Sequence, residues 1–518
     1  MNWMPIRPAR FARILCPAVL LVAGWLVATG SARGLDRAEI LAAIHSITTE
    51  EVKTTVEVLA DDSFEGREAG SRGGRAAGNY LMKEFEKLGL SPAGDGKTYF
   101  QAFNGTSRNI LGLLEGSDPN LKEEIIVVGA HYDHVGYGRP TNSFGPFGFI
   151  HNGADDNASG VSGLLEIIGA MRHLPTAPRR SILFALWDAE EQGLLGSQHW
   201  LNAPTLPVSR VVCAINMDMI GRLRDSKLEV LGCRTGTSFR RIISEANSDT
   251  GLALDFSWKM KADSDHWPFF TRSIPSLMFH TGLHGEYHRP SDDTHTINNE
   301  GIAQVTRVAF LTALELANRE QLGGFRAASR GETVSHQAAA EQPVQPQAPR
   351  FGLPLRVEAG DPPKFVLTSV PAGSAAEKGG LLAGDRLLEL NGQAIRDEKR
   401  MRLELLAAEG ETQLLIERPG QDLPLSVKLM PLGPPIRVGI TWRWDEAEPG
   451  SVLITQVVYG SAAHGAGLAV RDRIHSVSGQ QFASSEAFGG LLTSLSGPLE
   501  MRVERGGRML TLPVEVLK

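Results

Sequence analysis

Four apolar segments of strand length alternate along the chain with segments of helical periodicity. The strand-like segments are EIIVVGA (124–130), SILFALW (181–187), VVCAIN (211–216) and IPSLMF (274–279). Apolar residues recur at helical spacing over 74–90 and 158–174. Because alternating strands and helices favour a parallel sheet with both faces covered, the sequence predicts an α/β domain over residues 34–325. We expect a mostly parallel, mixed central sheet flanked by helices.

Histidines and carboxylates stand at the ends of these segments. Taken singly, each would be a helix cap or a surface residue more often than a functional one. In an open parallel sheet, however, the carboxyl ends of the strands meet at one edge, where ligands bind. Imidazole and carboxylate together suit zinc, and suit manganese or cobalt less selectively. The residues in question are His131, Asp133, Asp155, Asp156, Glu190, Glu191, Asp218 and His288.

The surrounding motifs resemble a known enzyme family. GAHYDHVG, NGADDNASG, WDAEEQGLLGS, INMDMIGR and YHRPSDD are similar to the five motifs of the M28 family of zinc aminopeptidases and carboxypeptidases. FEGREAGSRGGRAAGNYL (64–81) resembles the opening segment of that family, and the resemblance covers residues 36–325. Many members insert a protease-associated domain before the first histidine, and the segment here is too short to hold one.

The resemblance implies a site for two zinc ions. Asp156 would bridge the ions, and it is chosen over Asp155 because the family's bridging aspartate directly precedes the NASG-type turn. Two close cations need a shared anion, and three carboxylates neutralise most of their charge. The five implied ligands are His131, Asp156 and Asp218 on one ion, and Asp156, Glu191 and His288 on the other.

The resemblance also assigns roles around the metals. Glu190 would be the general base that takes a proton from the attacking water and passes it to the leaving amine. Tyr287 would help to hold the oxyanion, and Asp133 would orient His131 from behind. The implied activity is exopeptidase hydrolysis, most often the removal of N-terminal residues from peptide or protein substrates. No role follows from the sequence for Asp188, and no catalytic role for Asp265 and His266.

Two alternatives stay open on the sequence. A glutaminyl cyclase-like transferase keeps much of the same ligand set but works with a single zinc, so counting metal ions distinguishes it. An inactive scaffold protein would typically have lost ligands, whereas this chain keeps all five and the base. The choice between aminopeptidase and carboxypeptidase rests on family frequency alone.

A second region of the chain is an internal repeat. Residues 351–393 match 438–480 at a constant offset of 87, with GSAA at 373 and again at 460. The order of strand, GSAA helix and GDRLLELNG resembles PDZ domains, which bind C-terminal peptides on backbone N–H groups. We therefore expect PDZ-like domains over 351–431 and 432–518, with FGL (351–353) and VGI (438–440) as the binding loops. Spacers or dimer contacts are the alternative roles.

Composition indicates where the protein works. Residues 1–33 combine three early arginines with the 15-residue apolar stretch 14–28 and small residues near Ala32, as in a signal peptide, so we expect a secreted or periplasmic protein. An uncleaved membrane anchor is the less favoured alternative.

A net charge of -7 argues against nucleic acid as a partner. The Ala-, Gln- and Pro-rich segment 326–350 has the composition of an extended linker. The sequence leaves a Cys213–Cys233 bridge undecided.

Overall fold

The four apolar segments form the centre of one sheet. A computed structural model describes residues 35–347 and 349–517. In it the predicted strands are β4 (Ile125–His131), β5 (Ser181–Trp187), β6 (Val211–Met217) and β9 (Ser276–His280). Every residue of β4 and β5 is buried. Continuous apolar runs are what a strand needs when both of its faces are covered, so this prediction is confirmed.

The sheet is mixed, with a parallel centre and antiparallel flanks. β4 pairs in parallel with β5 and β6, and β6 pairs in parallel with β9. β3 (Ser107–Leu114) and β7 (Lys227–Leu231) then add antiparallel to β5 and β9. The nine strands are completed by the short elements β1 (Ser91–Pro92), β2 (Phe100–Phe103) and β8 (Ala253–Phe256). The sequence predicted the mixed α/β sheet, but not its antiparallel flanks.

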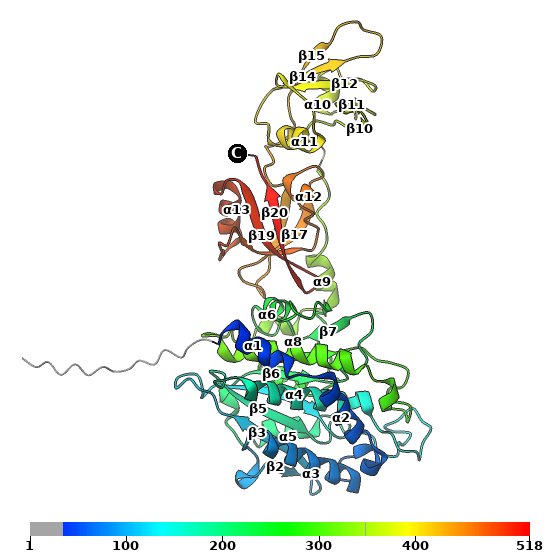
Figure 1. The fold of residues 1–518 in the computed structure, drawn as a ribbon, viewed down its shortest axis with the longest axis vertical. Coiled ribbons are helices and arrows are strands. Elements are labelled where there is room, and N and C mark those ends of the chain that lie inside the picture. Colours follow the sequence, from blue (N-terminus) through cyan, green and yellow to red (C-terminus); the bar gives the residue numbers. More distant parts are fainter. Residues whose placement is uncertain (1–34, 348, 518) are drawn as a thin grey trace, which may run out of the picture. The chain divides into compact units, whose positions relative to one another are not determined.

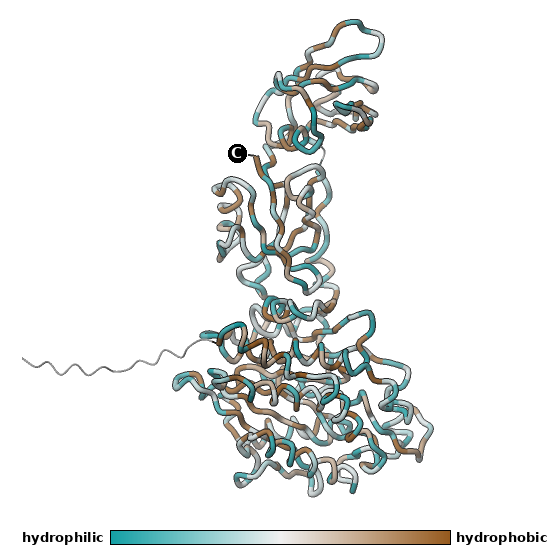
Figure 2. Tube along the Cα trace, viewed as in Figure 1, coloured by the Kyte–Doolittle hydropathy of each residue, from teal (hydrophilic) through white to brown (hydrophobic). Residues whose placement is uncertain are grey.

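Helices cover both faces of this sheet (Figure 1). α4 (Gly160–His173) and α8 (Asn299–Asn318) pack together on one face of β4. On the other face, Trp200 of α5 (Leu195–Asn202) and Phe269 of α7 (His266–Thr271) pack on Trp187, with ring centroids 6.1 Å apart. Figure 2 shows hydrophobic residues gathered inside the α/β domain. The remaining helices of this domain are α1 (Arg37–His45), α2 (Thr49–Leu59), α3 (Arg72–Lys87) and α6 (Phe239–Ala246).

The C-terminal region contains two small antiparallel sheets whose elements follow the same order, apart from the short strand β13 that only the first sheet has. The first sheet has the order β10-β11-β12-β14-β15 and the second the order β16-β17-β18-β19-β20. The first consists of β10 (Leu355–Glu358), β11 (Lys364–Leu367), α10 (Ala375–Lys378), β12 (Arg386–Leu390), β13 (Gln393–Ala394), α11 (Glu398–Ala407), β14 (Thr412–Glu417) and β15 (Leu425–Leu429). The second consists of β16 (Ile440–Trp444), β17 (Val452–Val457), α12 (Ala462–Gly465), β18 (Arg473–Val477), α13 (Ser485–Ser494), β19 (Pro498–Arg505) and β20 (Arg508–Glu515). Three pairs of elements, α10 with α12, β12 with β18 and α11 with α13, start and end at the offset of 87 found in the sequence.

The segment 326–350 is more ordered than its composition predicts. It contains the short turn η6 (Ala327–Arg330) and the helix α9 (Val334–Ala340). Thr333 caps this helix, since its side chain accepts a hydrogen bond from the backbone N–H of His336. Alanine is the best helix former, and Thr333 satisfies a free N–H group at the start, which together account for the helix.

The sequence left the pairing of the cysteines open and predicted a signal peptide at the N-terminus. Cys213 and Cys233 are both buried free thiols, so no bridge joins them. The predicted signal peptide, residues 1–33, lies outside the described residues. Within 35–347 and 349–517, no helix combines the length and apolar character that crossing a membrane requires.

Candidate metal centre

Five segments bring their polar residues to one edge of the sheet. His131 is the last residue of β4, Glu190 and Glu191 follow β5, and Asp218 follows β6. Asp156 lies in the turn η3 (Ala154–Ser159) before α4. The loop after β9 supplies His288. This is the edge formed by the carboxyl ends of the parallel strands, where the topology of such sheets places ligands.

One group of donor atoms surrounds the His131 imidazole. His131 Nε2 lies 3.3 Å from Asp156 Oδ1 and 3.4 Å from Asp218 Oδ1. Ligands about 2 Å from a shared tetrahedral zinc are about 3.3 Å from one another, so these separations fit one ion. A carboxylate oxygen of Glu190 also lies within 4.8 Å of the donor atoms of His131 and Asp218.

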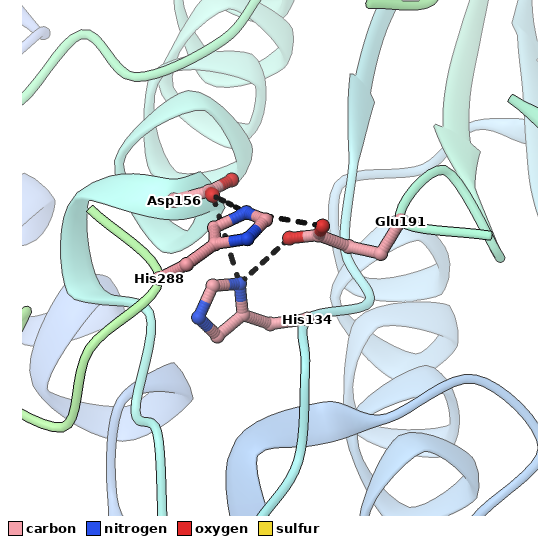
Figure 3. Close-up of side chains that lie close together, drawn as sticks. All are labelled: His134, Asp156, Glu191 and His288. Carbon is pink, nitrogen blue, oxygen red and sulfur yellow. Dashed lines mark hydrogen bonds and ion pairs between the residues drawn. The ribbon is translucent and has the colours of Figure 1, made fainter. Parts of the chain in front are cut away.

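A second group lies on the other side of Asp156 (Figure 3). His288 Nε2 is 3.0 Å from Asp156 Oδ2 and 3.1 Å from Glu191 Oε2. His134 Nδ1 is 2.9 Å from Glu191 Oε1 and 3.8 Å from Asp156 Oδ2. Asp156 therefore turns one oxygen towards His131 and the other towards His288. Buried nitrogen and oxygen donors at these separations fit two zinc ions sharing one carboxylate.

The structure brings all five sequence-predicted ligands together and places His134 beside them, a residue that the sequence analysis did not single out. His134 lies in the motif HYDHVG, three residues after His131, and its side chain is buried. The available signal was a second histidine in the same strand-end motif.

Charge in this cluster favours cations. Burial lowers the pKa of the His288 imidazole, but hydrogen bonds to Asp156 and Glu191 outweigh it and raise that pKa to about 10. Burial raises the pKa of Asp156, but hydrogen bonds from His131 and His288 hold it well below its usual range. These opposite shifts indicate strong attraction between the carboxylates and any positive charge placed among them.

Asp133 supports the carboxylates as well as the histidine. Its Oδ1 and Oδ2 accept the backbone N–H groups of Glu190 and Glu191, at 3.0 and 3.4 Å. His131 Nδ1 lies 3.2 Å from the backbone oxygen of Asp133 and 3.8 Å from its carboxylate. The Asp133 main chain is thus the nearer partner of the imidazole, and the Asp133 carboxylate fixes the loop after β5 that carries Glu190 and Glu191.

Buried polar contacts fix the turn that carries Asp156. The carboxylate of Asp292 accepts the backbone N–H groups of Asp155 and Asp156, at 3.1 and 3.0 Å. Asp155 turns away from the imidazoles of the two ligand groups and accepts the backbone N–H of Gly221 at 2.6 Å. The structure therefore places Asp156, and not Asp155, between the two groups, which is where the sequence motif put it.

Tyr287 lies beside the second group. Its ring stacks on His288 with centroids 3.9 Å apart. Burial raises the pKa of its phenol, and the charges of Asp156 and Glu191 raise it further. The phenol therefore stays protonated at neutral pH and is available as a hydrogen-bond donor.

The three residues without an assigned role lie behind the site. Asp188 Oδ2 accepts the backbone N–H of Arg108 at 2.8 Å and so ties the end of β5 to β3. Asp265 accepts a hydrogen bond from Ser197, and burial lowers the pKa of His266 to about 4. None of the three belongs to either ligand group among the described residues.

Comparisons with known proteins identify the domains that this chain resembles. Residues 366–418 match the PDZ domain model. The chain is 29% identical over 229 residues to aminopeptidase YwaD of Bacillus subtilis, covering 42% of this chain and 46% of that protein. It is 32% identical over 252 residues to probable leucine aminopeptidase 2 of Trichophyton verrucosum, covering 43% and 47%. The chain thus spans about half the length of these curated relatives.

Solved structures and a family model complete the comparison. The structure of BSAP, a zinc aminopeptidase from Bacillus subtilis, is 18% identical with a TM-score of 0.43, covering 53% of this chain and 96% of that one. The LapA aminopeptidase of Legionella pneumophila is 22% identical with a TM-score of 0.45, covering 57% and 79%. The model of peptidase family M28 matches residues 109–313. The chain therefore carries a peptidase family M28 domain, followed by a PDZ domain.

Proposed function

We propose that this protein is a dinuclear zinc exopeptidase that removes N-terminal residues from peptides. The observation that carries the proposal is the position of Asp156, which turns one oxygen to each of two ligand groups, with Glu190 beside the first. A shared carboxylate is what two neighbouring cations require. The curated relatives named above are called aminopeptidases, which favours the N-terminal direction.

Each residue then has a separate task. His131 and Asp218 would hold one ion, Glu191 and His288 would hold the other, and Asp156 would contribute one oxygen to each. Zinc bound there would polarise the scissile carbonyl and lower the pKa of a nucleophilic water. Glu190 accepts the proton of that water and delivers it to the leaving amine. The phenol of Tyr287 donates to the oxyanion as charge develops on it.

Replacing Glu190 tests the base assignment. In Glu190→Gln we expect kcat on amino acid p-nitroanilides to fall by about 10²–10⁴-fold, because the amide cannot accept the proton. Zinc content should stay at two ions per chain, since Glu190 is not a ligand in this proposal. Glu191→Gln is the matched control. Because Glu191 is a proposed ligand, this variant should bind less zinc, and it should also lose activity. Near wild-type turnover by metal-loaded Glu190→Gln would contradict the assignment.

Metal counting and substrate end groups test the rest. Two zinc equivalents per chain support hydrolysis, whereas one equivalent with cyclisation of N-terminal glutamine would support the glutaminyl cyclase-like alternative. A panel of peptides with free and blocked N-termini decides the direction of attack. Cleavage of N-blocked peptides from the C-terminus would replace the aminopeptidase proposal by a carboxypeptidase.

The remaining parts of the chain have proposed boundaries and roles. The peptidase domain would occupy 34–325, and the linker 326–350 would join it to PDZ-like domains over 351–431 and 432–518. The second of these is supported by the elements repeated at an offset of 87. Their role would be to hold the C-terminus of a substrate and raise its local concentration.

Export is the last part of the proposal. Residues 1–33 would direct the chain to the periplasm or the medium and be removed near Ala32, as their charge and apolar stretch suggest. N-terminal sequencing of the exported protein tests this. An N-terminus beginning at Met1 in the membrane fraction would support the uncleaved anchor instead.

A further inference from the structure

We infer that His134 is a fourth protein ligand of the ion held by Asp156, Glu191 and His288, so that the two zinc positions differ in strength. This inference rests on the proposed dinuclear site. It concerns one residue that the family resemblance leaves out and that the structure places among the ligands.

The His134 imidazole points towards the other donor atoms of this group. Four donor atoms, one each from His134, Asp156, Glu191 and His288, lie within 4.8 Å of one another. Figure 3 shows the rings of His134 and His288 meeting the same two carboxylates. Glu191 turns Oε1 towards His134 and Oε2 towards His288. His134 Nδ1 therefore faces the space between the carboxylates, where an ion would lie.

The surrounding fold holds His134 in place. The guanidinium of Arg67 donates to the backbone oxygens of Tyr132 and Gly153, which belong to the loops that carry His134 and Asp156. The backbone N–H of His134 donates in turn to the Arg67 oxygen at 3.3 Å. The ring also packs on Gly153, where a Cβ would lie 2.5 Å from His134 Cδ2. A donor fixed in this way loses little conformational freedom on binding a metal.

Unequal coordination follows from this geometry. With His134, one ion has four protein ligands, the number typical of structural zinc, whereas catalytic zinc keeps a position open. Glu190 also offers an oxygen within 4.8 Å of the donor atoms of His131 and Asp218. Because the proposed function keeps Glu190 free as the base, the ion held by His131, Asp156 and Asp218 has three protein ligands. The four-ligand ion should therefore bind more tightly, and the three-ligand ion should exchange first and face the substrate.

The alternative is that His134 Nδ1 only donates a hydrogen bond to Glu191. His134→Gln separates the two roles, because its amide can donate to Glu191 but is a poor zinc ligand. His134→Ala removes both interactions. Zinc affinity would be measured on purified holoenzyme by competition with a chelator, and the visible spectrum would be recorded after replacement of zinc by Co²⁺. Thermal unfolding of each variant confirms that it is folded.

For wild type we expect one zinc equivalent to resist the chelator after the other is lost. Both His134→Gln and His134→Ala should weaken that resistant equivalent by more than about 100-fold, beyond the 10–100-fold typical of a residue behind the ligands, and should change the Co²⁺ spectrum. His151→Gln, a buried histidine outside both groups, is the control and should change neither.

Two outcomes would overturn the inference. If His134→Gln keeps the wild-type affinity and spectrum, His134 is a hydrogen-bond donor and not a ligand. If wild type loses both equivalents together, the two positions are not unequal. Either result leaves the exopeptidase proposal standing, because that proposal fails only if Glu190→Gln stays active or if wild type binds fewer than two ions.

Discussion

Glu190 and Glu191 are adjacent in the sequence, but their surroundings shift their pKa values in opposite directions and suit them to different roles. Burial raises the pKa of Glu190 well above its usual range, although the His131 charge opposes this. Burial and Asp156 also raise the pKa of Glu191, but hydrogen bonds from His134 and His288 outweigh them and lower it. A carboxylate that stays ionised suits a metal ligand, and one with a raised pKa suits proton transfer.

Arg67 is the residue whose replacement should most disturb the site without touching a ligand. Its guanidinium is buried and donates to four backbone oxygens, those of Leu59, Tyr132, Asn152 and Gly153. Lysine lacks the planar fork, so Arg67→Lys leaves buried carbonyls without donors. We expect a loss of about 3 kcal/mol in the free energy of unfolding, measured by urea unfolding of the metal-free protein.

The matched control for this change is an exposed arginine. Arg72 pairs with Glu65 at the surface, so Arg72→Lys should cost less than about 1 kcal/mol. Equal unfolding midpoints for Arg67→Lys and Arg72→Lys would contradict the role assigned to Arg67.

Among single residues, the sequence predicted those that match a family motif. It did not predict the roles of residues whose contacts lie far away in the sequence. The five ligands and Glu190 were chosen by resemblance, and the structure brings them together. Asp188 could not be interpreted, because its partner is the backbone of Arg108, 80 residues away. His134 was missed because its meaning depends on Glu191, 57 residues away, and not on its own neighbours.

Among the elements, buried central strands were predictable and the flanking strands were not. The predicted bounds of β5 match the observed ones, because a short unbroken apolar run is typical of a fully buried strand. β3 contains Gly112, where a Cβ would lie 2.7 Å from Leu90 Cδ1 and 2.9 Å from Phe85 Cδ2. That glycine serves packing against α3 and weakens the strand pattern. Whether a strand pairs parallel or antiparallel depends on its partner, which periodicity does not reveal.

The turn before α4 is the element on which both ligand groups depend. Gly153 has φ of +58°, and a Cβ there would lie 2.2 Å from the backbone oxygen of Asp156. Gly153→Ala should therefore displace Asp156, the carboxylate that both groups share. We expect zinc content per chain, measured by atomic emission, to fall from both positions together.

Gly148→Ala is the matched control for this variant. Gly148 also has a positive φ, of +80°, but nothing lies within 4 Å of the position that a Cβ would take there. The control thus carries similar backbone strain without the collision, and it should keep its zinc. Full zinc occupancy in Gly153→Ala would show that the turn tolerates the added atom and would contradict the prediction.

At the scale of the whole molecule, the two C-terminal sheets preserve the same internal supports. Arg418 pairs with buried Asp385 at 2.8 Å, and Arg505 pairs with buried Asp472 at 2.7 Å, which are positions 87 residues apart. In the second sheet Arg471 stands where the first has Gly384, and both adopt a positive φ. The backbone is therefore retained although the residue differs, which supports a second PDZ-like copy.

The peptide-delivery role makes a prediction about both ends of a substrate. A PDZ domain holds a free C-terminal carboxylate, whereas the proposed peptidase acts at the N-terminus. A long peptide with a free C-terminus should therefore have kcat/KM about tenfold or more above the same peptide with a C-terminal amide. An amino acid p-nitroanilide cannot contact a PDZ domain and the peptidase site at the same time. Its hydrolysis therefore measures the basal activity.

A change in the first binding loop should weaken this preference. Gly352 has φ of +69°, and a Cβ there would lie 2.4 Å from Ser374 Cβ, so Gly352→Ala should distort the loop 351–353. Gly373→Ala is the control, since Gly373 has φ of +75° with nothing within 4 Å. We expect Gly352→Ala to reduce the difference in kcat/KM between the free and the amidated peptide, with p-nitroanilide kinetics unchanged. If wild type already treats the two peptides alike, the PDZ-like domains do not deliver substrates, and a role as spacers or dimer contacts becomes the better explanation.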